Sequence, residues 1–156
     1  PRLDRMEEGD VVLGMPSTGV HSNGFSLARK AVDPEDRAAW EELLVPTKIY
    51  VKEVTELLGT GRVLGAAHIT GSGLSGNVDR VLPKGLRARF SWDWPVPPIF
   101  AKIQKGGGIS DEEMRNVFNM GIGMTVIAKK EEAEGLVEIA TSKGMTLFPV
   151  GVLARG

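Results

Sequence analysis

Residues 11–24 read VVLGMPSTGVHSNG, a largely apolar run followed by a proline and a polar segment punctuated by glycines. The run Val11–Met15 is typical of a buried strand, which Pro16 ends. Glycine, serine and asparagine favour turns, so Ser17–Gly24 is predicted to be a loop. Apolar residues then recur at helical spacing from Phe25 to Val32. We therefore expect a strand, a glycine-rich loop and a helix in immediate succession.

The rest of the chain repeats these patterns. Short apolar or alternating runs predict further strands at 64–69, 86–92, 124–128 and 145–153. Helical spacing, with capping residues before it and proline or glycine after it, predicts helices at 33–44, 49–58, 74–82, 98–104, 110–118 and 131–143. Asp33 and Ser110 are the expected caps of the first and fifth of these helices. This mixture predicts one α/β (α+β) domain, a mixed sheet of about four to six strands with helices packed on its faces.

The composition excludes several classes of protein. Of the 156 residues, 42% are hydrophobic and 25% are charged, which is ordinary for a folded domain and excludes a disordered or collagen-like chain. The absence of cysteine excludes disulfides and thiolate chemistry. Nineteen basic and 20 acidic residues favour neither nucleic acid nor an anionic membrane as a partner. No run approaches the ~20 apolar residues of a membrane-spanning helix, and we expect a cytoplasmic protein.

Glycine is in excess, at 20 of 156 residues against a usual share of about 7%. Much of it lies in three turns, at 19–24, 71–76 and 121–123, and the only two histidines, His21 and His68, lie in or just before the first two. Glycine lets backbone N–H groups approach an anion, hydroxyls donate hydrogen bonds, and imidazole exchanges protons near neutral pH. The two loops therefore favour a phosphate site with proton transfer; the alternative is two plain turns with structural histidines.

Other motifs are weaker. Residues 71–76 match G-x-G-x-x-G with Asp93 about 20 residues further on, as in a dinucleotide site. The preceding strand is polar at His68 and Thr70, and Pro83 ends the following helix early, so we do not favour this interpretation. Ser17 and Ser22 have no G-x-S-x-G context, and we predict no metal ligands.

Several motifs occur in an order that points to one family. They are Gly9–Gly14, Ser17–Leu27, Leu44–Tyr50, Ala67–Leu74, Arg80–Pro83, Pro97–Phe100 and Phe118–Met124. Together they resemble the C-terminal domain of the aminoimidazole ribonucleotide synthetase family, the phosphoribosylformylglycinamidine cyclo-ligases. His-Ser-Asn-Gly at 21–24 is shared with related ATP-using enzymes, whereas Pro-Thr-x-Ile-Tyr at 46–50 and Phe-Asn-Met-Gly-Ile-Gly at 118–123 point to the synthetases themselves.

The resemblance implies a domain organisation and an activity. Residues 1–156 would be a single C-terminal domain, without the family's N-terminal domain, which carries most of the ATP-binding residues and forms the homodimer. The family enzymes are ligases of de novo purine biosynthesis. They convert formylglycinamidine ribonucleotide and ATP into aminoimidazole ribonucleotide, ADP and phosphate, by phosphorylating the formyl oxygen before a substrate nitrogen attacks. Mg²⁺ serves the ATP, mainly in the missing domain. We expect this chain alone to be inactive.

The resemblance also marks positions for a small-molecule ribonucleotide substrate. His21 and His68 are the candidates for proton transfer. The candidates for binding substrate or phosphate are Ser17, Thr18, Gly19, Ser22, Asn23, Gly24, Thr70, Gly71, Ser72, Gly73, Asn119 and Gly121. The chain departs from the family pattern at Ser72, where a glycine is usual, and at Gly76 and Asp79, where Glu and Pro are usual.

Two alternatives remain. One is a related ATP-using enzyme, such as formylglycinamidine ribonucleotide synthetase, selenophosphate synthetase or thiamine-phosphate kinase. The other is a non-catalytic domain that binds phosphorylated metabolites.

Overall fold

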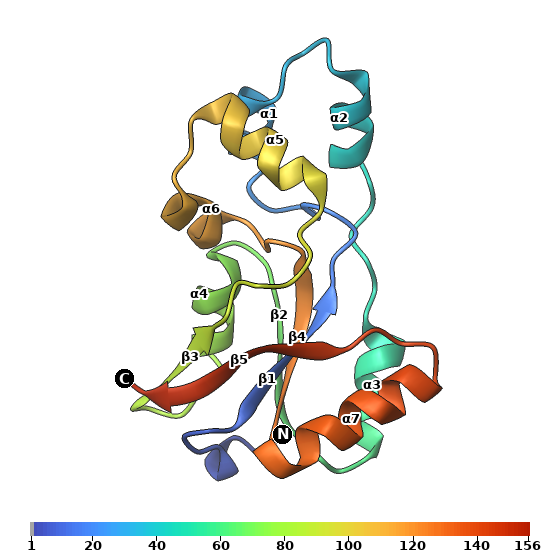
Figure 1. Cartoon of the computed structure of the whole chain (residues 1–156), viewed down its shortest axis with the longest axis vertical. Coiled ribbons are helices and arrows are strands. Elements are labelled where there is room, and N and C mark those ends of the chain that lie inside the picture. Colours follow the sequence, from blue (N-terminus) through green and yellow to red (C-terminus); the bar gives the residue numbers. More distant parts are fainter. Residues whose placement is uncertain (1) are drawn as a thin grey trace.

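A computed structural model describes residues 2–156, which form one five-stranded sheet, seven α-helices and a short 3-10 turn (Figure 1). The strands are β1 (Val11–Pro16), β2 (Val63–His68), β3 (Leu86–Phe90), β4 (Ile122–Ala128) and β5 (Phe148–Arg155). The helices are α1 (Phe25–Ala31), α2 (Arg37–Leu43), α3 (Val51–Gly59), α4 (Gly73–Asp79), α5 (Pro98–Gly107), α6 (Asp111–Val117) and α7 (Lys130–Ser142), and the turn is Leu3–Arg5. The predicted α/β (α+β) class and the predicted number of strands are confirmed.

The sheet has the strand order β2-β4-β1-β5-β3, and its four pairings are all antiparallel. This corrects the expectation of a mixed sheet. No two strands that are neighbours in the sheet are consecutive in the chain. The sequence therefore contains no hairpin motif from which the direction of a strand pair could be predicted. Strand direction is instead set by where each long connection returns to the sheet.

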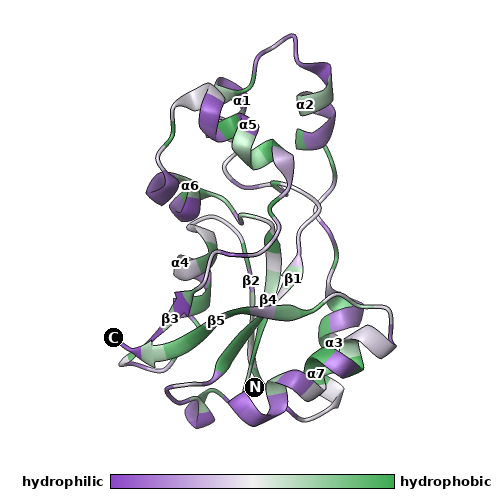
Figure 2. Ribbon diagram, viewed as in Figure 1, coloured by the Kyte–Doolittle hydropathy of each residue, from purple (hydrophilic) through white to green (hydrophobic). Residues whose placement is uncertain are grey.

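Alternate residues of β1, β2 and β4 enter two different cores. Leu13 and Met15 of β1 pack with α3 and α7 on one face, whereas Val12 packs on the other face with Leu74 and Val78 of α4. Two apolar faces explain why β1, β2 and β4 read as nearly continuous apolar runs, whereas β3 alternates because Arg87 and Arg89 are exposed. Figure 2 shows hydrophobic residues along β5 and the central strands, and mostly hydrophilic residues in α6.

Four helices do not lie on the faces of the sheet. Helices α1, α2, α5 and α6 form a separate cluster beyond one end of it, at the top of Figure 1, with its own core around Phe100 and Phe118. The expectation that the helices pack on the sheet therefore holds for α3, α4 and α7 and is wrong for the others. The connections that leave and re-enter the sheet at this end are long enough for α1, α2, α5 and α6 to bury their apolar sides against one another.

Local capping signals set several helix ends. Ser110 accepts a hydrogen bond from the Glu113 N–H at 3.2 Å, the predicted cap of α6, and Pro98 begins α5 as predicted. The predicted cap at Asp33 is wrong. Asp33 accepts the Glu35 N–H within a turn, and Asp36 caps α2 through the Ala39 N–H at 3.0 Å. No helix within residues 2–156 is long and apolar enough to cross a membrane.

Candidate functional site

The three glycine turns meet at one end of the sheet. Strands β1 and β2 each pair antiparallel with β4. The carboxyl ends of β1 and β2 therefore lie beside the start of β4. Pro16 lies opposite Ile122, and His68 lies opposite Met124. The backbone ties the turns together through Ser17 N–H, which donates to the Gly121 carbonyl at 2.8 Å. The site residues predicted from three distant segments are therefore neighbours in space.

Asn119 joins the first turn to the third. Its side chain is buried and accepts hydrogen bonds from the Ser17 hydroxyl at 3.0 Å and the Gly121 N–H at 2.8 Å. Its amide nitrogen donates to the Gly19 carbonyl at 2.8 Å. Because these contacts use its carbonyl oxygen twice and its amide group once, Asn119 holds the loops in position rather than presenting its amide to a ligand.

Asn77 holds the second glycine turn in position through its side-chain hydrogen bonds. Its buried amide group donates to the carbonyls of Thr70, Gly71 and Gly73 at 2.6–3.2 Å, and the Thr70 hydroxyl donates to its oxygen at 3.0 Å. A trans peptide directs its N–H opposite to its carbonyl. Turning these carbonyls toward Asn77 therefore directs the N–H groups of Gly71 and Ser72 outward, and within residues 2–156 no acceptor binds either of them.

His21 is fixed in one tautomer. It is buried, and its Nε2 accepts the N–H groups of Thr18 at 3.2 Å and Lys48 at 3.5 Å, so the proton is on Nδ1. Nδ1 is buried without a hydrogen-bond partner among the residues that the structure describes. Burial, with His68 and Lys48 nearby, lowers the pKa of His21. The ring is thus a neutral N–H donor whose basic nitrogen is already engaged.

Tyr50 stands between the two histidines. Its ring centre lies 6.2 Å from that of His21 and 6.1 Å from that of His68. The hydroxyl donates to the Pro16 carbonyl at 2.7 Å, and burial raises the pKa of this phenol, so it stays protonated. His68 is exposed and lines a cavity of about 550 Å³ with Met124 and residues 47–51, 54 and 55.

Residues 46–50 form a wall of the site that the loop chemistry alone did not predict. The Thr18 hydroxyl donates to the Pro46 carbonyl at 2.9 Å, and the hydroxyls of Ser22 and Thr47 lie 3.0 Å apart. A signal was present, since Pro-Thr-x-Ile-Tyr is one of the motifs that carry the family resemblance. This motif contains neither histidine nor glycine, so the sequence analysis predicted no site residue in it.

The remaining predicted residues divide into two groups. Thr18, Ser22 and Ser72 are exposed, and an ideal Cβ on Gly71 would lie 3.8 Å from Asn23 Oδ1, so the first two loops adjoin. Gly24 and Gly73 instead permit close packing against α6. A Cβ on Gly24 would overlap the Phe118 ring, and a Cβ on Gly73 would overlap the Arg115 carbonyl. Both have positive φ, so glycine is required there for conformation as well as for space.

Comparison with known proteins identifies the family. Residues 7–156 match the family model described as AIR synthase related protein, C-terminal domain. The chain belongs to this family. It is 42% identical to the phosphoribosylformylglycinamidine cyclo-ligase of Bacillus velezensis over 98% of this chain, and 45% identical to that of Myxococcus xanthus over 97%. In both cases it spans 48% of the relative, about half of its length.

Solved structures agree on the fold of this AIR synthase-related domain. A structure described as T. maritima PurL complexed with FGAR superposes with a TM-score of 0.59 at 17% identity, over 96% of this chain and 24% of that one. A structure described as T. maritima PurL complexed with AMPPCP superposes with a TM-score of 0.53 at 18% identity, over 96% of this chain and 22% of that one.

The three positions of this AIR synthase-related domain at which the sequence analysis expects departures from the family pattern lie in α4 or directly before it. Ser72 adopts a left-handed conformation with φ of 80°, and an ideal Cβ on Gly76 would lie 2.7 Å from the Ser72 Cβ. Ser72 therefore requires glycine at position 76. Asp79 accepts the Ala88 N–H of β3 at 3.1 Å, which fixes the end of α4 against the sheet.

Proposed function

We propose that this chain is the C-terminal, substrate-binding domain of an ATP-dependent phosphoribosylformylglycinamidine cyclo-ligase. The complete enzyme converts formylglycinamidine ribonucleotide and ATP into aminoimidazole ribonucleotide, ADP and phosphate. The observation that carries the proposal is the meeting of the three glycine turns and both histidines at one end of the sheet, in a chain 42–45% identical to named cyclo-ligases. Those identities also disfavour the selenophosphate synthetase and thiamine-phosphate kinase alternatives.

The first and second glycine turns bind different parts of the substrate. The outward N–H groups of Gly71 and Ser72 suit the 5′-phosphate of the ribonucleotide, because backbone donors at a glycine turn stabilise an anion. The exposed hydroxyls of Thr18 and Ser22 suit the polar remainder of the substrate. Asn119 and Asn77 keep these loops in place through their buried hydrogen bonds.

The two histidines differ in role. His68 is exposed at the cavity and accepts the proton that the attacking nitrogen loses during ring closure. His21 has a positioning role, because its Nε2 accepts the N–H groups of Thr18 and Lys48 and so holds the first glycine turn against residues 46–50. A neutral ring suits this task because Nε2 must stay unprotonated to accept these hydrogen bonds, and burial disfavours the charged ring.

ATP supplies the phosphoryl group that turns the formyl oxygen into a leaving group. Residues 2–156 contain no set of three or more His, Cys, Asp or Glu side chains placed to hold a metal ion. We assign Mg²⁺ and most of the ATP contacts to the N-terminal domain of the same cytoplasmic enzyme, as the resemblance to the family implies.

That N-terminal domain needs a surface to dock on. The segment 44–58 carries five exposed large apolar side chains, at Leu44, Val45, Ile49, Val51 and Leu58. Ile49 and Val51 are 79% and 71% exposed and flank the cavity beside His68. Apolar surface concentrated in this way marks an interaction site. We propose that the N-terminal domain covers it, closes the site over the substrate and forms the homodimer.

The decisive experiment uses the complete protein. We expect it to form aminoimidazole ribonucleotide from formylglycinamidine ribonucleotide and ATP, measured by mass spectrometry of the product together with ADP release. His68→Gln should lower kcat about 10²–10⁴-fold, the usual contribution of a general base, with little change in KM. Ser26→Ala, at an exposed position of α1 outside the residues proposed to bind substrate, is the control. A complete protein that forms no product, or an isolated domain that does, would refute the proposal.

A further inference from the structure

We propose that Arg80 completes the phosphate site of the second glycine turn and selects for a phosphorylated substrate. This inference rests on the proposed function and deepens it, because it names the side chain that supplies positive charge. The backbone N–H groups of Gly71 and Ser72 carry only partial charges, whereas a phosphate monoester carries close to two negative charges at neutral pH. A guanidinium beside them supplies the missing charge with directional donors.

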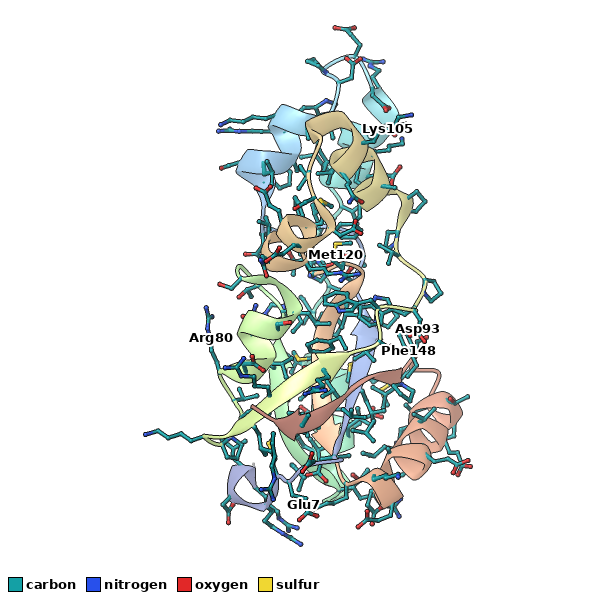
Figure 3. The ribbon with its side chains drawn as sticks, turned by 60° about the vertical axis from the view of Figure 1, so that its left-hand side comes forward. Glu7, Arg80, Asp93, Lys105, Met120 and Phe148 are labelled. Carbon is teal, nitrogen blue, oxygen red and sulfur yellow. The ribbon has the colours of Figure 1, made fainter. Side chains whose placement is uncertain are left out.

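The guanidinium of Arg80 is held beside the turn. One nitrogen donates to the Ser72 hydroxyl oxygen at 3.1 Å and the other donates to the Asn77 amide oxygen at 3.4 Å. Asn77 is the residue that turns the loop carbonyls inward, so Arg80 and the outward N–H groups are fixed by one hydrogen-bond network. Arg80 lies at the outer surface beside α4 in Figure 3, where a ligand from solvent reaches it.

The charge of Arg80 is not neutralised within the part of the chain that the structure describes. The ion pairs among residues 2–156 do not include it, and both of its acceptors are neutral. Two contacts leave three of its five N–H donors free. An arginine oriented by neutral neighbours, with its charge available, is arranged for an anionic ligand rather than for a structural ion pair.

Ser72 and Gly76 set this arrangement. Ser72 occupies a left-handed conformation that glycine adopts with less strain, and its hydroxyl is the nearer of the two acceptors for Arg80. The Ser72 Cβ fills the space above Gly76, so a side chain at position 76 would displace it. The strained serine is thus explained by its contact with Arg80.

The test is calorimetric titration of the complete protein with ribose 5-phosphate, and with ribose as the uncharged comparison. Arg80→Gln should weaken ribose 5-phosphate binding at least tenfold, about 1.4 kcal/mol, and leave ribose unaffected. Arg80→Lys should retain part of the affinity, since it keeps the charge and loses the planar donors. Arg37→Gln, an exposed arginine on α2, removes the same charge far from the turn and should bind as wild type does.

The variant Ser72→Gly tests whether the Ser72 hydroxyl positions Arg80, as distinct from an effect on folding. Glycine relieves the strain at φ of 80° and keeps the backbone N–H groups, so the variant should be at least as stable as wild type while binding ribose 5-phosphate several-fold more weakly. Unchanged affinity in Arg80→Gln would overturn the role of Arg80 and leave the cyclo-ligase proposal standing. If the wild-type protein binds ribose 5-phosphate no better than ribose, the phosphate site itself is refuted. Loss of product formation tests the proposed function separately.

Discussion

Replacing Asn119 by alanine tests whether the site is held together as the structure indicates. The substitution leaves the Ser17 hydroxyl, the Gly121 N–H and the Gly19 carbonyl without their partner. Each hydrogen bond contributes about 1 kcal/mol, and two of these three are buried. We therefore expect Asn119→Ala to lower the free energy of unfolding by about 3 kcal/mol, which corresponds to a fall in Tm of about 6–12 °C for a chain of this length.

Urea unfolding of the purified chain, followed by circular dichroism, measures this loss. Ser17→Ala removes only the 3.0 Å contact to Asn119 and should cost about 1 kcal/mol or less. The double variant should be about as stable as Asn119→Ala alone, because the two residues share that bond. Asn119→Asp keeps both accepted hydrogen bonds but places a carboxylate oxygen against the Gly19 carbonyl, so it should be destabilised as well. A loss below about 1 kcal/mol for Asn119→Ala would refute the reasoning.

Two further predictions concern pH and packing. The pKa of His21 is lowered in the folded chain, so below the unfolded value of about 6.5 the unfolded chain binds more protons. Stability should therefore fall as the pH drops from about 6.5 to the folded pKa, and His21→Gln should show a flatter profile in urea titrations; parallel profiles would contradict this. A Cβ on Gly106 would overlap the Ala31 carbonyl where α5 crosses α1, so Gly106→Ala should cost about 1–3 kcal/mol. Gly59→Ala, at the open end of α3, should be neutral or stabilise by up to about 1 kcal/mol, and equal effects of the two changes on Tm would count against the packing.

The sequence by itself determined the local elements and the family. Apolar spacing identified all five strands and seven helices of residues 2–156 to within a few residues, since period and capping are properties of neighbouring residues. The error at Asp33 arose because two acidic residues three apart both suit a helix cap, and the fold selected Asp36. The glycine turns and both histidines were found because their chemistry is visible in single residues.

Only the tertiary structure decided how those pieces meet. The antiparallel order of the strands brings Ser17 and Asn119 together across 102 residues of sequence, and nothing local to either residue names the other. The tautomer of His21 depends on two N–H donors to Nε2, that of Thr18 three residues away and that of Lys48, which reaches it from a connection 27 residues away. Residue types can be read along the chain, but hydrogen-bond partners, burial and the resulting pKa depend on how the strands pair. The sequence therefore predicted which residues make up the site, whereas the tertiary structure determined their contacts and protonation.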